Sequence, residues 1–193
     1  MYKIAVLAST NGTDFQAIID EIKAGTLKNV EIVGLFTNRA QCGAVAKAEK
    51  AGIPVFTFSS KGKSREIFDT EMIEKLQELK VDLIVLIGYM RILSDKFVQT
   101  FPRKIINVHP SLLPKFAGGM DTNVHEEVLK SREKTTGCTI HFVDEKLDGG
   151  EIICQKSCPV FPDDTPESLK KRVQDLEKKW YPRVIQDLAD GKI

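Results

Sequence analysis

The chain has 193 residues, of which 42% are hydrophobic and 28% charged, and its 28 basic and 27 acidic side chains leave a formal net charge of +1. This balance excludes the global basic field typical of proteins that bind nucleic acid or anionic membranes. The longest apolar run, Leu83–Met90, is far shorter than the roughly 20 residues of a membrane span. Because Met1–Ser9 is also too short for a secretory signal, we expect one cytoplasmic domain, residues 1–193, with reduced cysteines.

The first hundred residues alternate short apolar runs with segments of helical period. The pattern predicts strands at Lys3–Leu7, Val30–Phe36, Val55–Phe58, Leu83–Ile87 and Ile105–Val108. It predicts helices at about 13–24, 41–51, 64–79 and 94–100. This alternation is typical of the α/β class, so we expect a Rossmann-like, mostly parallel twisted sheet with helices on both faces.

The pattern changes after residue 120. It predicts a helix at 122–131, strands at 135–142 and 151–158, and a long final helix at 165–188. The start of this last helix, Asp164-Thr165-Pro166-Glu167, offers a capping side chain followed by proline at the first helical position.

The first strand runs into Ser9-Thr10-Asn11-Gly12-Thr13-Asp14, directly before a predicted helix. In an α/β sheet, such a turn can hold a phosphate on backbone N–H groups at the helix N-terminus. It is neither the glycine-rich dinucleotide fingerprint nor a Walker loop, so neither NAD nor ATP is indicated. A plain turn, with Thr13 or Asp14 capping the helix, explains these residues equally well.

Two polar side chains, Asn107 and His109, occupy alternate positions at the end of an otherwise apolar strand. Alternate residues of a strand point to the same side. A carboxamide and an imidazole together suit the stabilisation of an oxyanion and proton transfer. A hydrogen-bonded structural histidine is the alternative, unless a carboxylate such as Asp148 meets His109. Asp148 precedes Gly149-Gly150, which could let it approach the imidazole closely, although Asp-Gly-Gly is also a common turn.

Two further patterns resemble metal sites, but each lacks a feature that such a site needs. Cys138, His141, Cys154 and Cys158 could be drawn as a zinc set, but residues three apart on a strand point to opposite faces, so we expect small buried thiols. His125-Glu126 begins like a zinc-protease helix and lacks the second histidine, so we expect a helix surface there.

Four stretches together identify a resemblance: Asn107–Pro114 (NVHPSLLP), Gly88–Leu93 (GYMRIL), Leu147–Gly150 (LDGG) and Glu177–Pro182 (EKKWYP). Over essentially its whole length the chain resembles the folate-dependent phosphoribosylglycinamide formyltransferases, enzymes of purine biosynthesis and one-carbon metabolism. The resemblance implies a phosphate-binding half, 1–100, and a folate-binding, catalytic half, 101–193.

The resemblance also implies the site residues. Catalysis would fall to Asn107, His109 and Asp148. The residues implied to bind the ribonucleotide are Gly12, Thr13 and Asp14 at the phosphate, and Gln174, Asp175, Leu176 and Glu177 at the ribose and glycinamide. Those implied to bind the folate are Arg65, Met90, Arg91, Ile92, Leu93, Asn107, Asp144, Glu145, Lys146, Leu147 and Asp148.

The implied reaction moves the formyl group of 10-formyltetrahydrofolate, a co-substrate, to the glycinamide amine by direct attack through a tetrahedral intermediate. It needs no metal and no partner beyond the two small molecules, with no nucleic acid or membrane; the protein would be a monomer or a homodimer.

Two positions depart from the family pattern. Asp14 stands where asparagine is expected, and a carboxylate aimed at phosphate would repel it, so we expect Asp14 to cap the helix and leave the backbone to bind. The segment 116–121 varies in the family.

Three alternatives remain. A formyltetrahydrofolate deformylase and a methionyl-tRNA formyltransferase share the Asn-x-His and Ser-Leu-Leu-Pro features but add a regulatory or a tRNA-binding domain, for which this chain leaves no room. A non-catalytic folate- or phosphate-binding module is the third.

Overall fold

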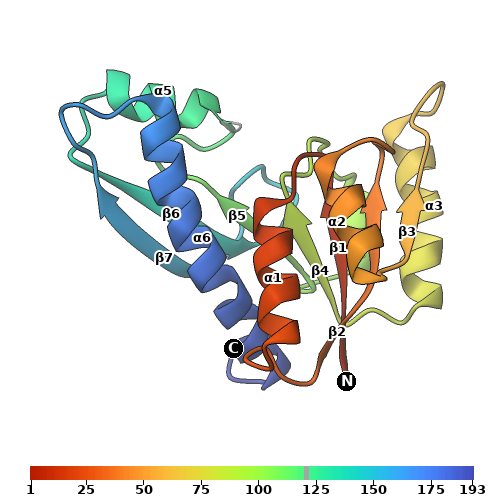
Figure 1. Ribbon diagram of the computed structural model, residues 1–193. Helices are drawn as coiled ribbons and strands as arrows, with labels where there is room; N and C mark the ends of the chain where they lie inside the picture. The colour runs from red at the N-terminus through yellow and green to blue at the C-terminus, as the bar shows by residue number, and fades with distance from the viewer. Residues whose placement is uncertain (120–121) are drawn as a thin grey trace.

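Seven strands form one sheet in the order β3-β2-β1-β4-β5-β6-β7 (Figure 1). The structure is a computed structural model that describes residues 1–119 and 122–193. Five strands are parallel: β1 (Tyr2–Ala8), β2 (Val30–Thr37), β3 (Val55–Thr57), β4 (Leu83–Ile87) and β5 (Ile105–His109). The antiparallel strands β6 (Thr135–Phe142) and β7 (Ile152–Pro159) extend the sheet beyond β5. The predicted mostly parallel α/β fold is confirmed, and one sheet joins the two predicted halves.

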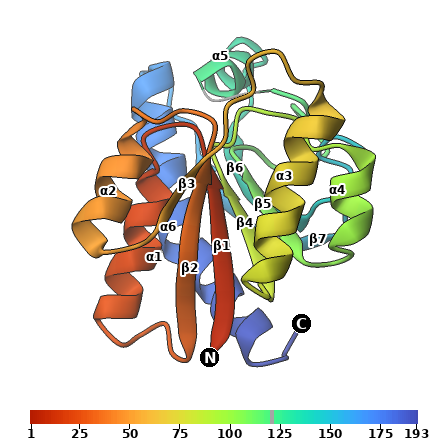
Figure 2. The ribbon, with the colours of Figure 1, turned by 90° about the vertical axis from the view of Figure 1, so that its right-hand side faces the viewer.

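Helices cover both faces of this sheet. They are α1 (Thr13–Lys23), α2 (Gly43–Ala51), α3 (Arg65–Glu78), α4 (Asp95–Thr100), α5 (Thr122–Lys130) and α6 (Pro166–Ala189). Figure 2 shows α1, α2 and α6 on one side and α3 and α4 on the other. Burial explains the division, because alternate residues of the central strands serve opposite cores. In β1, Ile4 and Val6 pack with α1 and α6, whereas Ala5 and Leu7 pack with α3 and α4.

The strand order fixes where a ligand can bind. From β1 the chain builds outward through β2 to β3, and then returns to place β4 on the other side of β1. The crevice at the carboxyl ends of β1 and β4 is therefore a topological switch point, where open α/β sheets bind their ligands. The chain termini lie at the opposite end of the sheet (Figure 1).

The final helix α6 begins as the sequence predicts. The Thr165 hydroxyl accepts a hydrogen bond from the Ser168 N–H (3.2 Å), the Ser168 hydroxyl accepts one from the Thr165 N–H (3.0 Å), and Pro166 opens the helix. Further along, the buried hydroxyl of Tyr181 lies 2.9 Å from the carbonyl oxygen of Leu86 in β4 and 3.1 Å from that of Ile106 in β5. These contacts attach α6 to the two strands that lead into the predicted site.

All four cysteines are free thiols. Cys138 and Cys158 are buried and pack with Val173 of α6. No helix in the described ranges has the length and apolar character needed to cross a membrane.

Candidate active site

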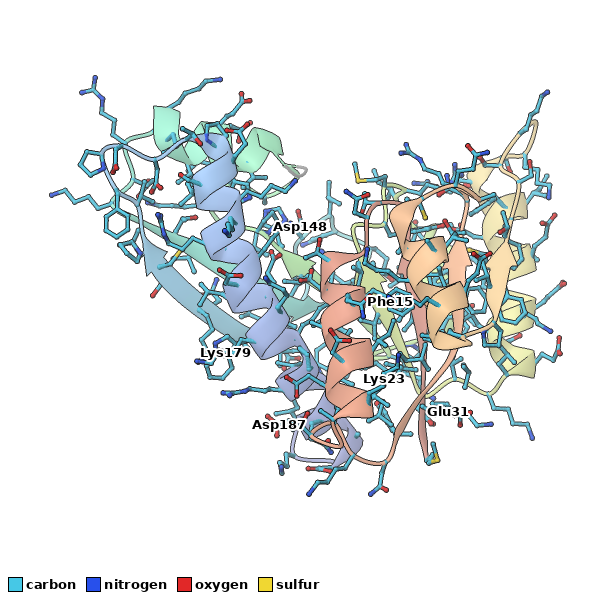
Figure 3. All side chains as sticks on the ribbon, in the orientation of Figure 1. Phe15, Lys23, Glu31, Asp148, Lys179 and Asp187 are labelled. Atoms are coloured by element: carbon cyan, nitrogen blue, oxygen red, sulfur yellow. The ribbon has the colours of Figure 1, made fainter. Side chains whose placement is uncertain are left out.

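A cleft of about 430 Å³ opens at the carboxyl ends of β1, β4 and β5. Its walls come from both predicted halves: the start of α1, the segment after β4, the end of β5, the loop after β6, and α6. In Figure 3 the labelled Asp148 lies between α6 and the first turn of α1. The volume lies within the range of small-molecule sites in proteins.

The turn before α1 is built for close approach. Gly12 has φ +64°, and a Cβ atom there would stand 2.9 Å from the Cβ of Ala44 in α2, so glycine meets both the conformation and the packing. The first helical hydrogen bond runs from the Gln16 N–H to the Gly12 carbonyl (3.1 Å). The N–H groups of the first turn have no partners within their own helix and can bind an anion. Thr13 lines the cleft beside them.

Asp14 does not cap the helix, and that expectation was wrong. The N-cap position is Gly12, which has no side chain to offer, and Asp14 is the second residue of α1. Its carboxyl group is buried and lies near α6. Burial, and to a lesser extent the Asp14 carboxyl group, raises the pKa of Tyr181 on α6. Burial also raises the pKa of Asp14 itself, and Lys178 of α6 partly offsets that rise. The Asp14 side chain makes no capping hydrogen bond to the N–H groups of its own first turn.

Asn107, His109 and Asp148 all line the cleft, and His109 meets Asp148, the contact that the sequence analysis left open. Nδ1 of His109 lies 3.3 Å from Oδ2 of Asp148, and the two side chains are only 4% and 8% exposed. Nε2 of His109 lies 2.9 Å from the carbonyl oxygen of Phe116. Both ring nitrogens thus lie within reach of oxygen atoms that can accept a hydrogen bond. Asp148 also accepts a hydrogen bond from the Gly118 N–H (2.8 Å), which ties the loop after β5 to the same carboxylate.

His141 is a site residue that the sequence analysis did not find. Its Nδ1 lies 2.8 Å from the Phe142 carbonyl and its Nε2 lies 3.3 Å from Nδ2 of Asn107. Burial lowers the pKa of His141, so the neutral ring donates from Nδ1 and accepts the Asn107 amide at Nε2. The second amide hydrogen of Asn107 stays available to the cleft.

The zinc arrangement left open above does not form around His141. Cys138 lies on the same strand but packs toward α6 with Val173. The neighbour of His141 is instead Asn107, because the two residues pair across β5 and β6. That pairing depends on the antiparallel register and could not be read from the sequence.

The turn after β6 brings Asp148 to the imidazoles. Asp148 has φ +53°, a conformation in which Asp is more common than most residues. A Cβ at Gly150 would stand 1.8 Å from the Phe142 carbonyl oxygen, so only glycine lets the turn return against β6. A Cβ at Gly149 would likewise stand 2.7 Å from the Cβ of Lys146, so both glycines permit the close approach.

Thr139 of β6 anchors the loop that follows His109. Its buried hydroxyl donates to the Ser111 carbonyl (2.7 Å) and accepts from the Leu113 N–H (3.0 Å) and from Nε2 of Gln155 (2.9 Å). Nε2 of Gln155 also donates to the Leu113 carbonyl (2.8 Å). One side chain of β6 thereby satisfies several polar groups of an irregular, buried segment.

A Thr139→Val substitution keeps the shape and removes this hydroxyl. We expect the free energy of unfolding to fall by about 2–3 kcal/mol, because buried partners lose their hydrogen bonds. Urea denaturation measures the change, and Thr139→Ser, which keeps the hydroxyl, is the matched control. If the two variants were equally stable, the hydroxyl would not be what holds the loop.

The segment after β4 forms an apolar wall. Met90, Ile92 and Leu147 are 36%, 51% and 55% exposed, and all three line the cleft. The Arg91 guanidinium stacks 4.3 Å from the centre of the Phe68 ring. Leu93, Asp144, Glu145 and Lys146 complete this wall. Exposed apolar side chains gathered at one cleft suit a planar, largely apolar ligand.

Arg65, also assigned to the folate, is not among the lining residues; it starts α3 and lies 3.6 Å from the Glu66 carboxylate.

The helical period places two of the four candidate residues on α6 toward the cleft. Gln174 and Glu177, three residues apart, both line the cleft. Asp175 instead pairs with Lys178 in solvent (2.6 Å), and Leu176 packs beside Cys138. Asp175 and Leu176 therefore do not line the cleft, which corrects that part of the assignment.

The sequence analysis missed further lining residues, among them His125 and Lys170. His125 of α5 is 1% exposed and lines the cleft, so the expectation of a helix surface was wrong; the amphipathic helix turns this residue inward with Val124 and Val128. Lys170 of α6 also lines the cleft. Met120 and Asp121, in the segment that varies within the family, lie outside the described residues.

Comparisons with known proteins agree on one family. A sequence profile described as formyl transferase matches residues 2–185. The phosphoribosylglycinamide formyltransferase of Haemophilus influenzae is 41% identical over an alignment that covers 100% of this chain and 90% of that protein. The trifunctional purine biosynthetic protein adenosine-3 of Bos taurus is 43% identical over 99% of this chain, which spans 19% of that longer protein. Glycinamide ribonucleotide transformylase 1 from Symbiobacterium toebii superposes with a TM-score of 0.93 at 36% identity, over 99% of this chain and 89% of that one.

Proposed function

The chain belongs to the formyl transferase family, and on that premise we propose that its cleft transfers the formyl group of 10-formyltetrahydrofolate to the glycinamide amine of 5'-phosphoribosylglycinamide. It is a folate-dependent formyltransferase of purine biosynthesis. The observation that carries the proposal is the convergence of Asn107, His109 and Asp148 at one end of a cleft whose other end is an anion-binding turn.

The ribonucleotide lies between α1 and α6. Its phosphate binds to the N–H groups of Thr13 and Asp14, at the positive end of the α1 dipole. Gln174 and Glu177 reach the ribose and the glycinamide from α6, since both side chains line that wall. The predicted halves thus contribute jointly, with the phosphate turn from 1–100 and the α6 residues from 101–193.

The folate lies along the apolar wall. Met90, Ile92 and Leu147 offer exposed apolar surface to its ring system, and the backbone of residues 90–93 and 144–148 offers hydrogen bonds to the ring's polar edge. Arg91 or Arg65 would meet the negative glutamate tail. The folate is a co-substrate, which leaves after each turnover. The steps proposed below use only side chains described here and require no metal.

In the reaction, the neutral amine nitrogen attacks the formyl carbon and the C=O electrons move to oxygen. The free amide hydrogen of Asn107 and an N–H of His109 stabilise the oxyanion of this tetrahedral intermediate. The attacking nitrogen then loses a proton and N10 of the folate gains one, with Asp148 and water as the relay. The oxyanion electrons then re-form the C=O bond as the C–N10 bond breaks, giving formylglycinamide ribonucleotide and tetrahydrofolate.

His109 must exchange a hydrogen bond for this to happen. Its Nε2 lies 2.9 Å from the Phe116 carbonyl oxygen, so either the Phe116 carbonyl or the ring shifts slightly when the formyl oxygen binds. Catalytic hydrogen bonds commonly reach their final geometry only with substrate bound.

The deciding experiment follows the conversion of 10-formyltetrahydrofolate to tetrahydrofolate by absorbance, with and without the ribonucleotide. We expect turnover only when the ribonucleotide is present. Equal turnover without it would indicate a deformylase, and turnover that needs methionyl-tRNA instead would indicate the tRNA enzyme. Tight binding of both ligands with no turnover would indicate a binding module.

A further inference from the structure

Asp14 combines features that the proposed mechanism leaves unexplained. Its side chain is only 7% exposed, yet it lines the cleft at the turn proposed to bind phosphate. Within the described part of the chain, its Oδ1 atom is buried and has no hydrogen-bond partner. A buried polar atom without a partner is costly, so such an atom beside a ligand site indicates that a proton or the ligand completes it.

The groups packed against Asp14 decide its charge. Burial raises the pKa of Tyr181 on α6 and of the Cys138 thiol on β6, so both stay neutral at physiological pH. Two further titratable groups are on α6: Glu177, which is 6% exposed and lines the same cleft, and Lys178, which is 38% exposed and acts on the pKa of Asp14. Lys178 lowers the pKa of Asp14, but burial outweighs it and raises that pKa to about 7.

Three more cationic or titratable groups lie around the turn. Lys47 of α2 donates to the Asn11 carbonyl (2.7 Å), on the outer side of the turn. Lys170 and His125 line the cleft. Lys47, Lys170 and His125 could partly neutralise the charge of a bound phosphate. The carboxyl group next to the N–H groups proposed to bind that phosphate is Asp14.

We propose that Asp14 binds the substrate phosphate as a neutral carboxylic acid, donating a hydrogen bond to a phosphate oxygen, so that the ribonucleotide is bound together with one proton. This inference rests on the proposed function, because it takes the phosphate to occupy the turn before α1. An ionised carboxylate has no hydrogen to donate and would repel a dianion, with Glu177 already nearby. The protonated acid removes the repulsion and gains a strong charge-assisted hydrogen bond.

The proposal links affinity to pH with a definite sign. At pH 8, the free protein holds about a tenth of a proton at Asp14, given a pKa of about 7. The complex holds nearly a whole one, since the bound anion favours the neutral acid. Ribonucleotide affinity should therefore fall up to about tenfold for each pH unit above 7.

Calorimetric titration of the ribonucleotide at pH 8, in two buffers of different ionisation enthalpy, counts the protons taken up. We expect the native protein to take up nearly one proton more than an Asp14→Asn variant. The control is Asp20→Asn, which removes an exposed carboxylate of the same helix, bonded to Gln16 at 2.8 Å, and should behave as the native protein does. Between pH 7.5 and 8.5, Kd should rise up to about tenfold more in the native protein than in Asp14→Asn.

Titration of the ribonucleotide's own amine and phosphate contributes equally to all three proteins and cancels. Equal proton counts in native protein and Asp14→Asn, with ribonucleotide-dependent turnover intact, would overturn this inference alone. Absence of ribonucleotide binding and turnover in the native protein would overturn the proposed function and this inference together. If Asp14→Asn does not fold, infrared difference spectra of the native protein with inorganic phosphate decide, because no new protonated-carboxyl band would refute the proposal.

Discussion

A His109→Ala protein is expected to lose about three orders of magnitude in kcat while it binds both substrates almost normally. In the proposed mechanism the imidazole donates a hydrogen bond to the oxyanion, and removing one such donor costs roughly 10²–10³ in rate; the imidazole also positions Asp148, which relays the proton. Neither role applies before the tetrahedral intermediate forms, so the loss should fall on kcat and not on affinity.

Two measurements on His109→Ala test this. Steady-state kinetics gives kcat, and fluorescence or calorimetric titration gives Kd for each substrate separately. Circular dichroism and thermal melting check the fold, because His109 is 3% exposed and contacts Phe116. A variant that keeps native kcat would refute the role of His109, whereas one that loses binding and kcat together would make His109 a binding residue.

An Asp148→Asn protein should lose about two to three orders of magnitude in kcat. The amide fills the same volume and can still accept the Gly118 N–H, so the turn is retained. What disappears is the carboxylate 3.3 Å from Nδ1 of His109, and with it the group that orients the imidazole and relays the proton.

A double-mutant cycle makes the Asp148 prediction sharper. If Asp148 acts through His109, removing both side chains should cost little more than removing His109 alone, because residues that act as a unit are strongly non-additive. Glu151→Gln is the control, since Glu151 belongs to the same connection but pairs with Arg103 in solvent. Additive losses in the cycle would mean that the two residues serve separate steps.

Most of the fold could be predicted from the sequence because each element carries its own signal. The apolar runs that form β1, β4 and β5 are bounded by polar turns. Thr165 and Pro166 mark the start of α6. Observed boundaries differ from the predicted ones by about two residues at most, as at the start of α2, where Gly43 follows two turn residues. Parallel pairing, with the antiparallel β6 and β7 added, follows from this element order.

The site was only partly predictable. Asn107 and His109 stand two apart on one strand, so their shared direction is a local property. The partnership of His141 with Asn107 arises from antiparallel pairing, and the inward position of His125 arises from the packing of α5 on α6. Asp14 was misjudged for the same reason: a capping residue and a residue buried against another helix look alike until the second helix is in place.

The hydroxyl of Tyr181 touches the carbonyl oxygens of Leu86 and Ile106, one residue upstream of Ile87 and of Asn107. The helix that carries Gln174 and Glu177 is therefore attached to β4, which leads into residues 88–93, and to β5, which carries Asn107 and His109. The two sides of the cleft therefore cannot move far apart to admit ligands. We therefore expect product release to depend on local movement near Phe116 and Lys146, and not on a hinge between α6 and the sheet.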